Sequence, residues 1–254
     1  MLVNDNLIID KVYIEGIPAL VFKPRNTFQE GLPLVILYHG WSSNKENQVM
    51  LASTIALYGY VVLAADAVNH GERGVLDYSD TENVVEKFWP TIFNNINESS
   101  KLIDYGINVL KADKKRIAVM GHSMGGFTAS GVFVTHPDLK TVINISGSFA
   151  YEKEEELMMS RFPEVLVDDD HKRELREYDP ILKLAALNKR PVLMLHGGED
   201  QVVPRGGEEY FYKEAESLYK DNPDDFKLVI YEGGNHSVTI KMVEELIVWL
   251  QEKL

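Results

Sequence analysis

Short apolar runs recur along the chain, and stretches with helical character separate them. Six runs of five or six residues are Pro33–Tyr38, Tyr60–Ala65, Arg116–Met120, Thr141–Ile145, Pro191–Leu195 and Lys227–Tyr231. Runs that are apolar on both faces and alternate with helices are typical of parallel sheets covered on both sides, so the pattern predicts an α/β fold with a mostly parallel sheet. Upstream, Leu7–Ile14 and Ala19–Lys23 flank a Gly-Ile-Pro turn and predict an antiparallel hairpin.

Helices are predicted over Glu46–Tyr58, from Thr81 to about Leu110, from the glycine-rich segment 121–126 to His136, and over Val238–Gln251. Trp89-Pro90 falls inside the second helix. Proline cannot donate the hydrogen bond of an interior helical residue, so a break is expected there. No repeat or low-complexity linker divides the chain, which predicts a single domain over residues 1–254.

Tyr151–Pro180 departs from this alternation because charge dominates it. Its thirty residues include eleven acidic and five basic ones, so it holds −6 of the net charge of −13. An insertion of this length in a compact domain is more often structured than a bare loop, and we interpret it as a helical lid, with a solvated helical excursion as the alternative. Met158, Met159 and Phe162 either line an adaptable apolar pocket or dock the insertion onto the core.

Composition and charge exclude several classes of function. The 254 residues carry a net charge of −13, which disfavours binding of nucleic-acid phosphates. They contain no Cys, which removes disulfides, thiolate metal sites and a cysteine nucleophile. The N-terminus lacks the pattern of a signal peptide, and no apolar run approaches the roughly 18 residues of a membrane span. We therefore expect a cytoplasmic protein with a small-molecule substrate and no nucleic-acid or membrane partner, and its oligomeric state stays open.

A nucleophile motif follows the third parallel run. Gly121-His122-Ser123-Met124-Gly125 matches G-x-S-x-G, directly after a buried strand and before a glycine-rich helix. In that context a sharp strand-to-helix turn projects a serine hydroxyl above the sheet edge, at the positive end of a helix. The pentapeptide alone occurs often by chance, so the prediction of Ser123 as nucleophile depends on this context.

A serine nucleophile needs a base, and the chain offers seven histidines: His39, His70, His122, His136, His171, His196 and His236. His236 lies in Gly233–Ser237, after the last strand and before the last helix, where the catalytic loops of open α/β sheets gather. His122 is expected to point away from the site, and His39 and His196 to shape loops at strand ends. We predict His236 as the base.

The predicted acid is Asp200, which follows the preceding strand at the same edge. It would orient the imidazole and stabilise its charged form. Glu199 is the rival acid and is expected to point the other way. The chain order Ser123, Asp200, His236 is that of α/β-hydrolases.

Two backbone N–H groups are predicted to form an oxyanion hole. Met124 supplies one, as the residue after the nucleophile. Trp41 is the candidate for the other, because it follows the first parallel run. The Trp41 indole also suits a packing role, and the two roles do not exclude each other.

Five blocks in order resemble the α/β-hydrolase superfamily, and within it the small bacterial esterases of the dienelactone hydrolase and prolyl-oligopeptidase-like group. The blocks are His39-Gly40-Trp41, Asp66 to Arg73, Gly121–Gly125, His196 to Asp200, and Asn235-His236. The resemblance covers nearly the whole chain. It implies an eight-stranded, mostly parallel sheet, a Ser-His-Asp triad and ester hydrolysis without a cofactor or metal. Dienelactone hydrolases proper use a cysteine nucleophile, so a dienelactone is not the expected substrate.

The loop Asn69–Gly74 holds a second group of polar side chains. His70 and Arg73 either face the pocket or brace the loop, with Arg73 paired to a nearby acid; bracing is the commoner role for such ion pairs. Asp66, His70 and Glu72 lack the partner spacing of a metal site, so none is predicted.

The expected function is hydrolysis of small carboxylic esters by a serine carboxylesterase through an acyl-enzyme. A thioesterase or amidase would use the same triad, and a transferase would pass the acyl group to an alcohol. A non-catalytic binding module on the same fold is the alternative from another class, although such modules usually lack one triad member. Nucleotide-dependent classes are disfavoured, because the chain has no P-loop and no G-x-G-x-x-G after its first parallel run.

Overall fold

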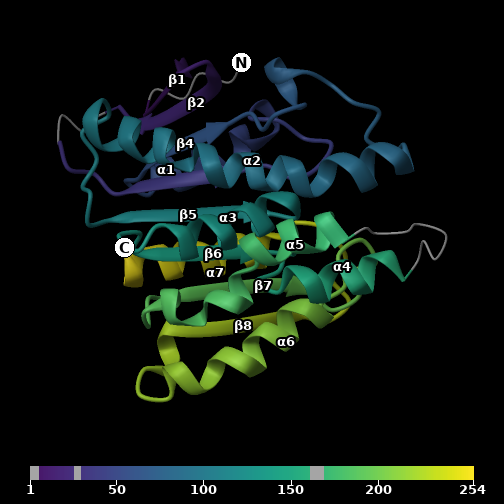
Figure 1. The fold of residues 1–254 in the computed structure, drawn as a ribbon. Helices are drawn as coiled ribbons and strands as arrows, with labels where there is room; N and C mark the ends of the chain where they lie inside the picture. The colour runs from purple at the N-terminus through teal and green to yellow at the C-terminus, as the bar shows by residue number, and fades with distance from the viewer. Residues whose placement is uncertain (1–5, 26–29, 161–168) are drawn as a thin grey trace.

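Eight strands form one sheet in the order β1-β2-β4-β3-β5-β6-β7-β8 (Figure 1). The computed structural model describes residues 6–25, 30–160 and 169–254. Its strands are β1 (Leu7–Ile14), β2 (Ile17–Pro24), β3 (Leu34–Tyr38), β4 (Val61–Ala65), β5 (Ile117–His122), β6 (Thr141–Ile145), β7 (Val192–Gly197) and β8 (Phe226–Tyr231). The six short apolar runs form β3 to β8, and these strands pair in parallel throughout. The predicted α/β fold with a mostly parallel sheet is confirmed.

The hairpin of β1 and β2 forms the antiparallel margin of the sheet. Its turn consists of Glu15 and Gly16, both in the left-handed region with φ of 48° and 86°. Two-residue hairpin turns of this kind match the twist of the strands, and glycine adopts the conformation without strain. The turn precedes the predicted Gly-Ile-Pro centre, because Ile17 already pairs with Ile14. β2 then pairs antiparallel with β4 and joins the hairpin to the parallel part.

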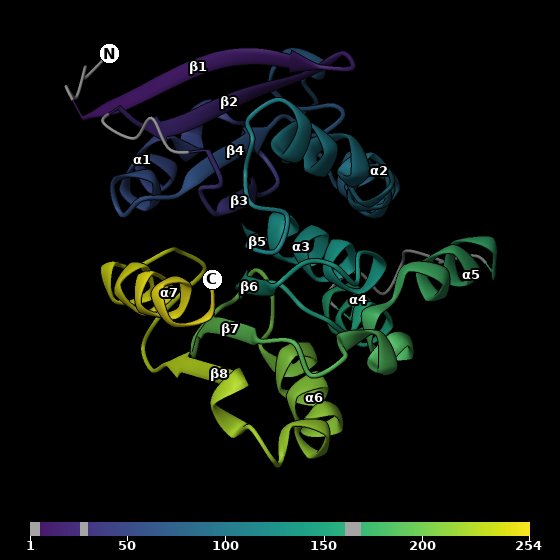
Figure 2. The same ribbon diagram turned by 90° about the vertical axis from the view of Figure 1, so that its left-hand side faces the viewer.

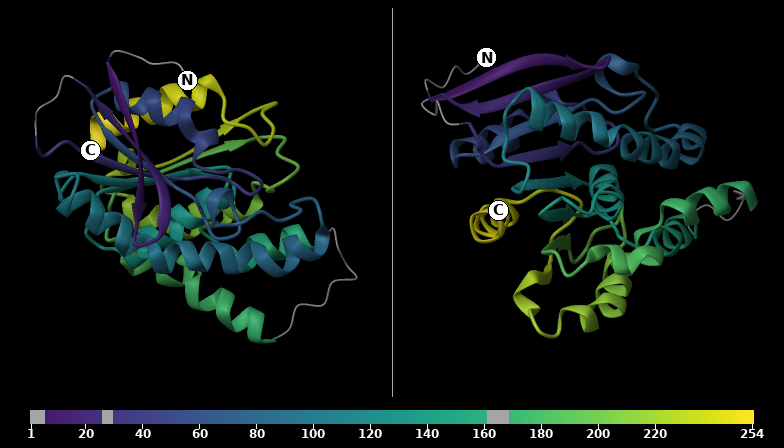
Figure 3. Two further views of the ribbon diagram at one scale, coloured as in Figure 1. Left: turned by 90° about the horizontal axis from the view of Figure 1, so that it is seen from above. Right: turned by 60° about the vertical axis from the view of Figure 1, so that its left-hand side comes forward.

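Helices cover both faces of the sheet (Figures 2 and 3). α1 (Val49–Leu57) and α7 (Ile240–Lys253) pack on one face, and α2 (Thr81–Asn108), α3 (Met124–Thr135) and α6 (Gly206–Ala215) pack on the other. A buried apolar cluster lies on each side of the strands as a result. The loops that follow the parallel strands therefore meet at one edge, between two covered faces.

α2 continues through Pro90 without interruption, so the predicted break was wrong. Proline removes one backbone hydrogen bond, but its neighbours Phe88, Trp89, Ile92 and Phe93 are buried in the core. Burial of these side chains offsets the lost bond. Neither α2 nor any other helix within the described ranges is long and apolar enough to cross a membrane.

The charged insertion is helical at both of its ends, as α4 (Tyr151–Met159) and α5 (Asp169–Tyr178). Both helices lie on the α2–α3 side of the sheet (Figure 2). Its acidic side chains are not all on the surface, because Glu154 and Asp179 are fully buried. Asp179 accepts hydrogen bonds from the N–H groups of Tyr151 and Glu152, each at 2.9 Å, and thereby caps α4. The start and the end of the insertion are thus joined to each other.

Arg190, just before β7, caps two helical segments at the end of the sheet where the parallel strands begin. It is 9% exposed, and its N–H groups donate to five carbonyls, those of Phe133, His136, Leu139, Ala186 and Leu187. The carbonyls of Phe133 and His136 lie at the end of α3, that of Leu139 follows it in the next loop, and the last two belong to the 3₁₀ segment Pro180–Leu187. Burial lowers the pKa of Arg190 to about 10, which still leaves the guanidinium charged at neutral pH. A buried cation is favourable here because helix ends carry partial negative charge.

We expect Arg190→Lys to destabilise the protein by at least about 2 kcal/mol, because an ammonium cannot reach five carbonyls and leaves buried acceptors unsatisfied. Urea unfolding measures the change. Arg173→Lys is the control, since the Arg173 side chain is 76% exposed and its pair with Asp170 contributes little. Equal stability of the two variants would contradict the capping role.

Candidate active site

The turn between β5 and α3 has the backbone of a nucleophile elbow. Ser123 lies in the left-handed region, with φ of 58° and ψ of −124°, and its carbonyl accepts a hydrogen bond from the N–H of Gly126 at 2.7 Å. Such a conformation costs a non-glycine residue about 1–3 kcal/mol and persists only where the surroundings enforce it. A Cβ on Gly125 would lie 2.1 Å from the carbonyl oxygen of Tyr38, so the end of β3 packs directly against the turn. The elbow predicted from the motif is present.

Asp200 and His236 are in direct contact. The Nδ1–H of His236 donates to Oδ2 of Asp200 at 2.7 Å; the carboxylate side chain is fully buried and the imidazole is 16% exposed. Oδ1 of Asp200 accepts from the N–H groups of Val202 and Val203 at 2.9 and 3.0 Å. Burial works to raise the pKa of Asp200, but the hydrogen bond and charge of His236, together with the two amides, outweigh it and lower that pKa. The ionised carboxylate therefore holds the Nδ1 proton in place and leaves Nε2 as the basic atom.

His196 and His39 brace the loops around this pair. The Nε2–H of His196 donates to the carbonyl of Val203 at 3.0 Å, and burial lowers the pKa of His196. Nε2 of His39 accepts from the N–H of Ala67 at 3.0 Å, and burial lowers the pKa of His39 to about 4. Both rings are therefore neutral near pH 7, and the prediction that they shape loops is confirmed.

His122 lies against His236, so the prediction that it points away was wrong. The two ring centroids are 4.8 Å apart, and burial lowers the pKa of His122 to about 4. The chain reverses only at Ser123, and the last side chain of β5 therefore stays among the loops at the sheet edge. The described residues show no hydrogen bond from the Ser123 hydroxyl to the imidazole. Such bonds are often long or poorly aligned before substrate binds.

Two backbone N–H groups next to Ser123 donate to no group within the described part of the chain: those of Met124, the first residue of α3, and Trp41. A Cβ on Gly40 would lie 3.4 Å from Cβ of Ser123, so the backbone before Trp41 runs beside Ser123. The Trp41 indole N–H donates to the carbonyl of Tyr78 at 3.0 Å. The indole thus fixes the loop, while the Trp41 amide is available as an oxyanion donor.

Lys45, which no sequence pattern singled out, anchors the same loop. Its side chain is fully buried, and its Nζ lies 2.6 Å from Oδ2 of Asp66 and 2.6 Å from Oε1 of Glu72. Burial works to lower the pKa of Lys45, but hydrogen bonds to the surrounding carboxylates, Asp66 first, raise it instead. The charged ammonium ties the loop after β3 to the loop after β4. Asp66 and Glu72 are 21 and 27 positions away from Lys45 in the sequence. Because of that separation, no local sequence pattern predicts the cluster.

One family model and several known proteins match this chain. The model described as the Dienelactone hydrolase family matches residues 17–245. The chain belongs to this family.

Two curated relatives and one solved structure extend the match. YitV of Bacillus subtilis (strain 168), provisionally named an esterase, is 28% identical over 254 residues that cover 97% of this chain and 99% of YitV. Esterase YjfP of Escherichia coli (strain K12) is 28% identical over 204 residues, 77% of this chain and 80% of YjfP. TT1662 from Thermus thermophilus has a TM-score of 0.81 at 22% identity over 97% of both chains, which shows the same fold.

The loop after β4 of this dienelactone hydrolase-family protein is braced. Arg73 donates to both carboxylate oxygens of Glu98 at 2.7 and 3.0 Å, as the bracing interpretation predicts. His70 is buried and stacks on Tyr78, with ring centroids 4.8 Å apart. Within the described ranges, no three His, Cys, Asp or Glu side chains are grouped so that they could hold a metal ion.

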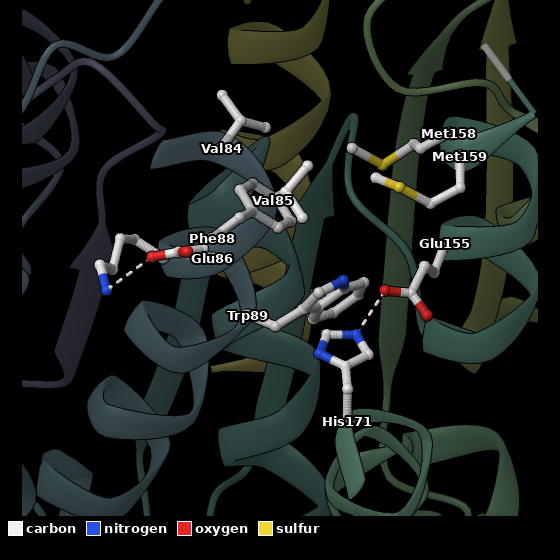
Figure 4. Close-up of a pocket in the computed structure, with 10 residues that line it drawn as sticks. Val84, Val85, Glu86, Phe88, Trp89, Glu155, Met158, Met159 and His171 are labelled. Atoms are coloured by element: carbon white, nitrogen blue, oxygen red, sulfur yellow. Dashed lines mark hydrogen bonds and ion pairs between the residues drawn. The ribbon is translucent and has the colours of Figure 1, made fainter. Parts of the chain in front are cut away.

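A cavity of about 520 Å³ lies between α2 and the α4–α5 pair (Figure 4). At its polar end the Nε2–H of His171 donates to Oε1 of Glu155 at 2.5 Å, which joins α5 to α4. Its apolar lining consists of Val84, Val85, Phe88, Trp89, Met158 and Met159. Cavities of this size and lining suit small organic ligands.

Phe88 connects this cavity to the candidate site. Its ring centroid lies 5.9 Å from that of Trp41 and 5.7 Å from that of Phe127, which is one helical turn after Ser123. Met158 and Met159 are thus placed in the wall of a cavity beside the site. Phe162, the third predicted pocket residue, lies outside the described residues.

We expect Lys45→Met to lower the free energy of unfolding by about 3–5 kcal/mol, because it leaves Asp66 as a buried carboxylate without its cation. Urea unfolding at neutral pH measures the loss. Lys23→Met is the matched control: Lys23 pairs with Asp10, both side chains are at least one-third exposed, and such pairs contribute less than about 1 kcal/mol. Equal losses in the two variants would mean that the buried cluster is not needed.

Proposed function

We propose that this protein is a serine carboxylesterase that hydrolyses small carboxylic esters through Ser123, His236 and Asp200. The observation that carries the proposal is the hydrogen bond of 2.7 Å between His236 and a buried, ionised Asp200, at the sheet edge where Ser123 sits in a strained elbow. The chain order Ser123, Asp200, His236 is that of the catalytic residues of α/β-hydrolases.

The proposed reaction has two halves. Oγ of Ser123 attacks the ester carbonyl while Nε2 of His236 takes its proton, and the N–H groups of Trp41 and Met124 bind the resulting oxyanion. The tetrahedral species collapses, the C–O bond to the alcohol breaks, and His236 gives its proton to the leaving alcohol. Water then attacks the acyl-enzyme with His236 again as the base. The carboxylic acid leaves, and the proton returns to Ser123.

Ser123→Ala is expected to lower kcat for a short-chain p-nitrophenyl ester by roughly 10⁴-fold or more, because the acyl-enzyme cannot form. Loss of labelling by a fluorophosphonate probe is expected in the same variant. Ser100→Ala, on the exposed side of α2, is the control and should retain both properties. Activity retained by Ser123→Ala would overturn the assignment.

The alternatives differ in the leaving group. A thioesterase or an amidase would use the same three residues, and a panel of matched ester, thioester and amide substrates separates them. The esterase names of YitV and YjfP favour the ester. A non-catalytic binding module would show neither labelling nor turnover.

We further propose that the cavity beside Phe88 receives part of the substrate and disfavours anionic groups. Glu155 lies in its lining, with its side chain 11% exposed, and Asp169, Asp170 and Glu174 are exposed on the neighbouring α5. A carboxylate on the substrate would meet like charge there in a partly desolvated site.

At low ionic strength, kcat/KM for a neutral ester should exceed that for a size-matched ester bearing a distal carboxylate by roughly tenfold, and added salt should narrow the ratio. The Glu155→Gln variant should show a smaller ratio of the two kcat/KM values at low salt. Glu252 is exposed on α7 on the other face of the sheet, so Glu252→Gln should leave the ratio unchanged. Equal rates for the two esters at low salt would exclude charge selection by this cavity.

A further inference from the structure

Glu155 lies in the wall of the cavity beside Phe88, and the protein uses only part of its capacity to accept hydrogen bonds. The residue is 8% exposed, and its carboxylate extends from α4 toward Trp89 and His171 (Figure 4). One oxygen accepts the Nε2–H of His171 at 2.5 Å, and the described residues donate no second bond to the carboxylate. A carboxylate can accept about four hydrogen bonds. Most of that capacity is therefore available to a group bound in the cavity.

The Lys and Arg side chains of the cavity walls pair with other acids. Lys87, which lines the cavity, contacts Glu86 at 3.2 Å. Lys153 of α4 and Arg176 of α5 contact acids of α4 other than Glu155, at 2.8 and 3.4 Å. Among the residues that the structure describes, no Lys or Arg forms an ion pair with Glu155. A cation for this buried carboxylate would therefore have to come from a ligand.

The rest of the cavity wall is mostly apolar. Met158 and Met159 follow Glu155 by three and four positions, so they lie on the same side of α4. Val84 and Phe88 of α2 line the cavity with them. Thioether side chains adapt to ligands of different shape. A volume of about 520 Å³ with one buried acid in an apolar wall suits an alkyl chain that ends in a positive charge.

We propose that this cavity binds an alkylammonium group, which is the distal end of an amine-bearing ester substrate; this inference rests on the proposed esterase function. The nitrogen binds Glu155, and the carbon chain lies between the two methionines and α2. An ammonium supplies both N–H donors and a positive charge, which is what a desolvated carboxylate requires. Phe88 contacts both the cavity and the ring of Trp41, so the amine is held at the end of the substrate remote from the reacting carbonyl.

The first test measures binding by isothermal titration calorimetry at low ionic strength, with hexylammonium, hexanol and hexanoate as probes of one chain length. Hexylammonium should bind roughly tenfold more tightly than hexanol, because it forms a charge-assisted hydrogen bond in a partly desolvated site. Hexanoate should bind more weakly than both. Glu155→Gln should remove most of the difference between hexylammonium and hexanol. Equal affinities for these two probes in the wild type would overturn the proposal.

Glu156→Gln is the matched control for the binding measurement. Glu156 lies on the same helix, but its side chain is 70% exposed and pairs with Lys153. Both variants change the net charge equally, so only a direct contact with the ligand makes them differ. Glu156→Gln should keep the preference for hexylammonium. Equal losses in Glu155→Gln and Glu156→Gln would refute the contact, because the attraction would then come from the overall negative charge.

Met159→Lys gives a further measurement, which decides the question if Glu155→Gln does not fold. The new ammonium would stand one helical turn after Glu155, where a Glu–Lys pair on a helix is favourable. It would thus supply from the cavity wall the cation that the ligand is proposed to bring. Binding of hexylammonium should be lost in this variant and kept in Met159→Gln. Undiminished binding by Met159→Lys would contradict the proposal.

The second test uses turnover, with the amine on either side of the ester bond. One pair of size-matched substrates is p-nitrophenyl 6-aminohexanoate and p-nitrophenyl heptanoate, and the other is 6-aminohexyl acetate and heptyl acetate. In at least one pair, kcat/KM should be roughly tenfold higher for the amine-bearing ester, mainly through KM, and Glu155→Gln should remove the difference. No preference in either pair contradicts the proposal. If no ester is hydrolysed, the proposed function fails, while the calorimetry still decides whether the cavity binds an amine.

Discussion

Burial of carboxylates near the sheet edge that holds Ser123 and His236 is the constraint on which the surrounding loops depend. An ionised carboxylate removed from water costs several kcal/mol unless donors compensate it. Asp66, Asp179 and Asp200 are all at most 6% exposed. Lys45 compensates the first, the opening amides of α4 the second, and His236 with two loop amides the third. Each compensation joins two segments that are far apart in the sequence, so satisfying these charges also assembles the site.

The same constraint decides which groups at the site carry charge. Burial lowers the pKa values of His39, His122 and His196, so these imidazoles stay neutral near pH 7. Asp200, in contrast, is held ionised by its donors. The negative charge of Asp200 is therefore directed at His236, without a competing imidazolium beside it. In the proposed reaction, a proton taken from Ser123 would be stabilised on His236 and not on a neighbouring ring.

Structural features that depend on neighbouring residues in the sequence can be predicted from it. Features that depend on contacts between residues far apart in the sequence cannot. The six parallel strands and the elbow at Ser123 follow from local runs of side chains, and the contact of Asp200 with His236 follows from where two strands end. The ion cluster of Lys45 escapes detection because its acids lie in another loop. The continuous α2 is missed for a similar reason, since proline propensity is local and the burial that outweighs it is tertiary.

The charged insertion shows how a residue count can mislead about electrostatics. The sequence suggests that its net charge of −6 lies on the protein surface. In the structure, however, Glu154 and Asp179 are fully buried and Glu155 is nearly so. Asp179 and Glu155 act through hydrogen bonds to α4 and His171, and Glu154 through its contact with α6. Salt screens the exposed charges of α5 more strongly than it screens Glu155, whose side chain is 11% exposed. Discrimination among substrates by charge therefore depends more on Glu155, which lines the cavity, than on the total charge of the insertion.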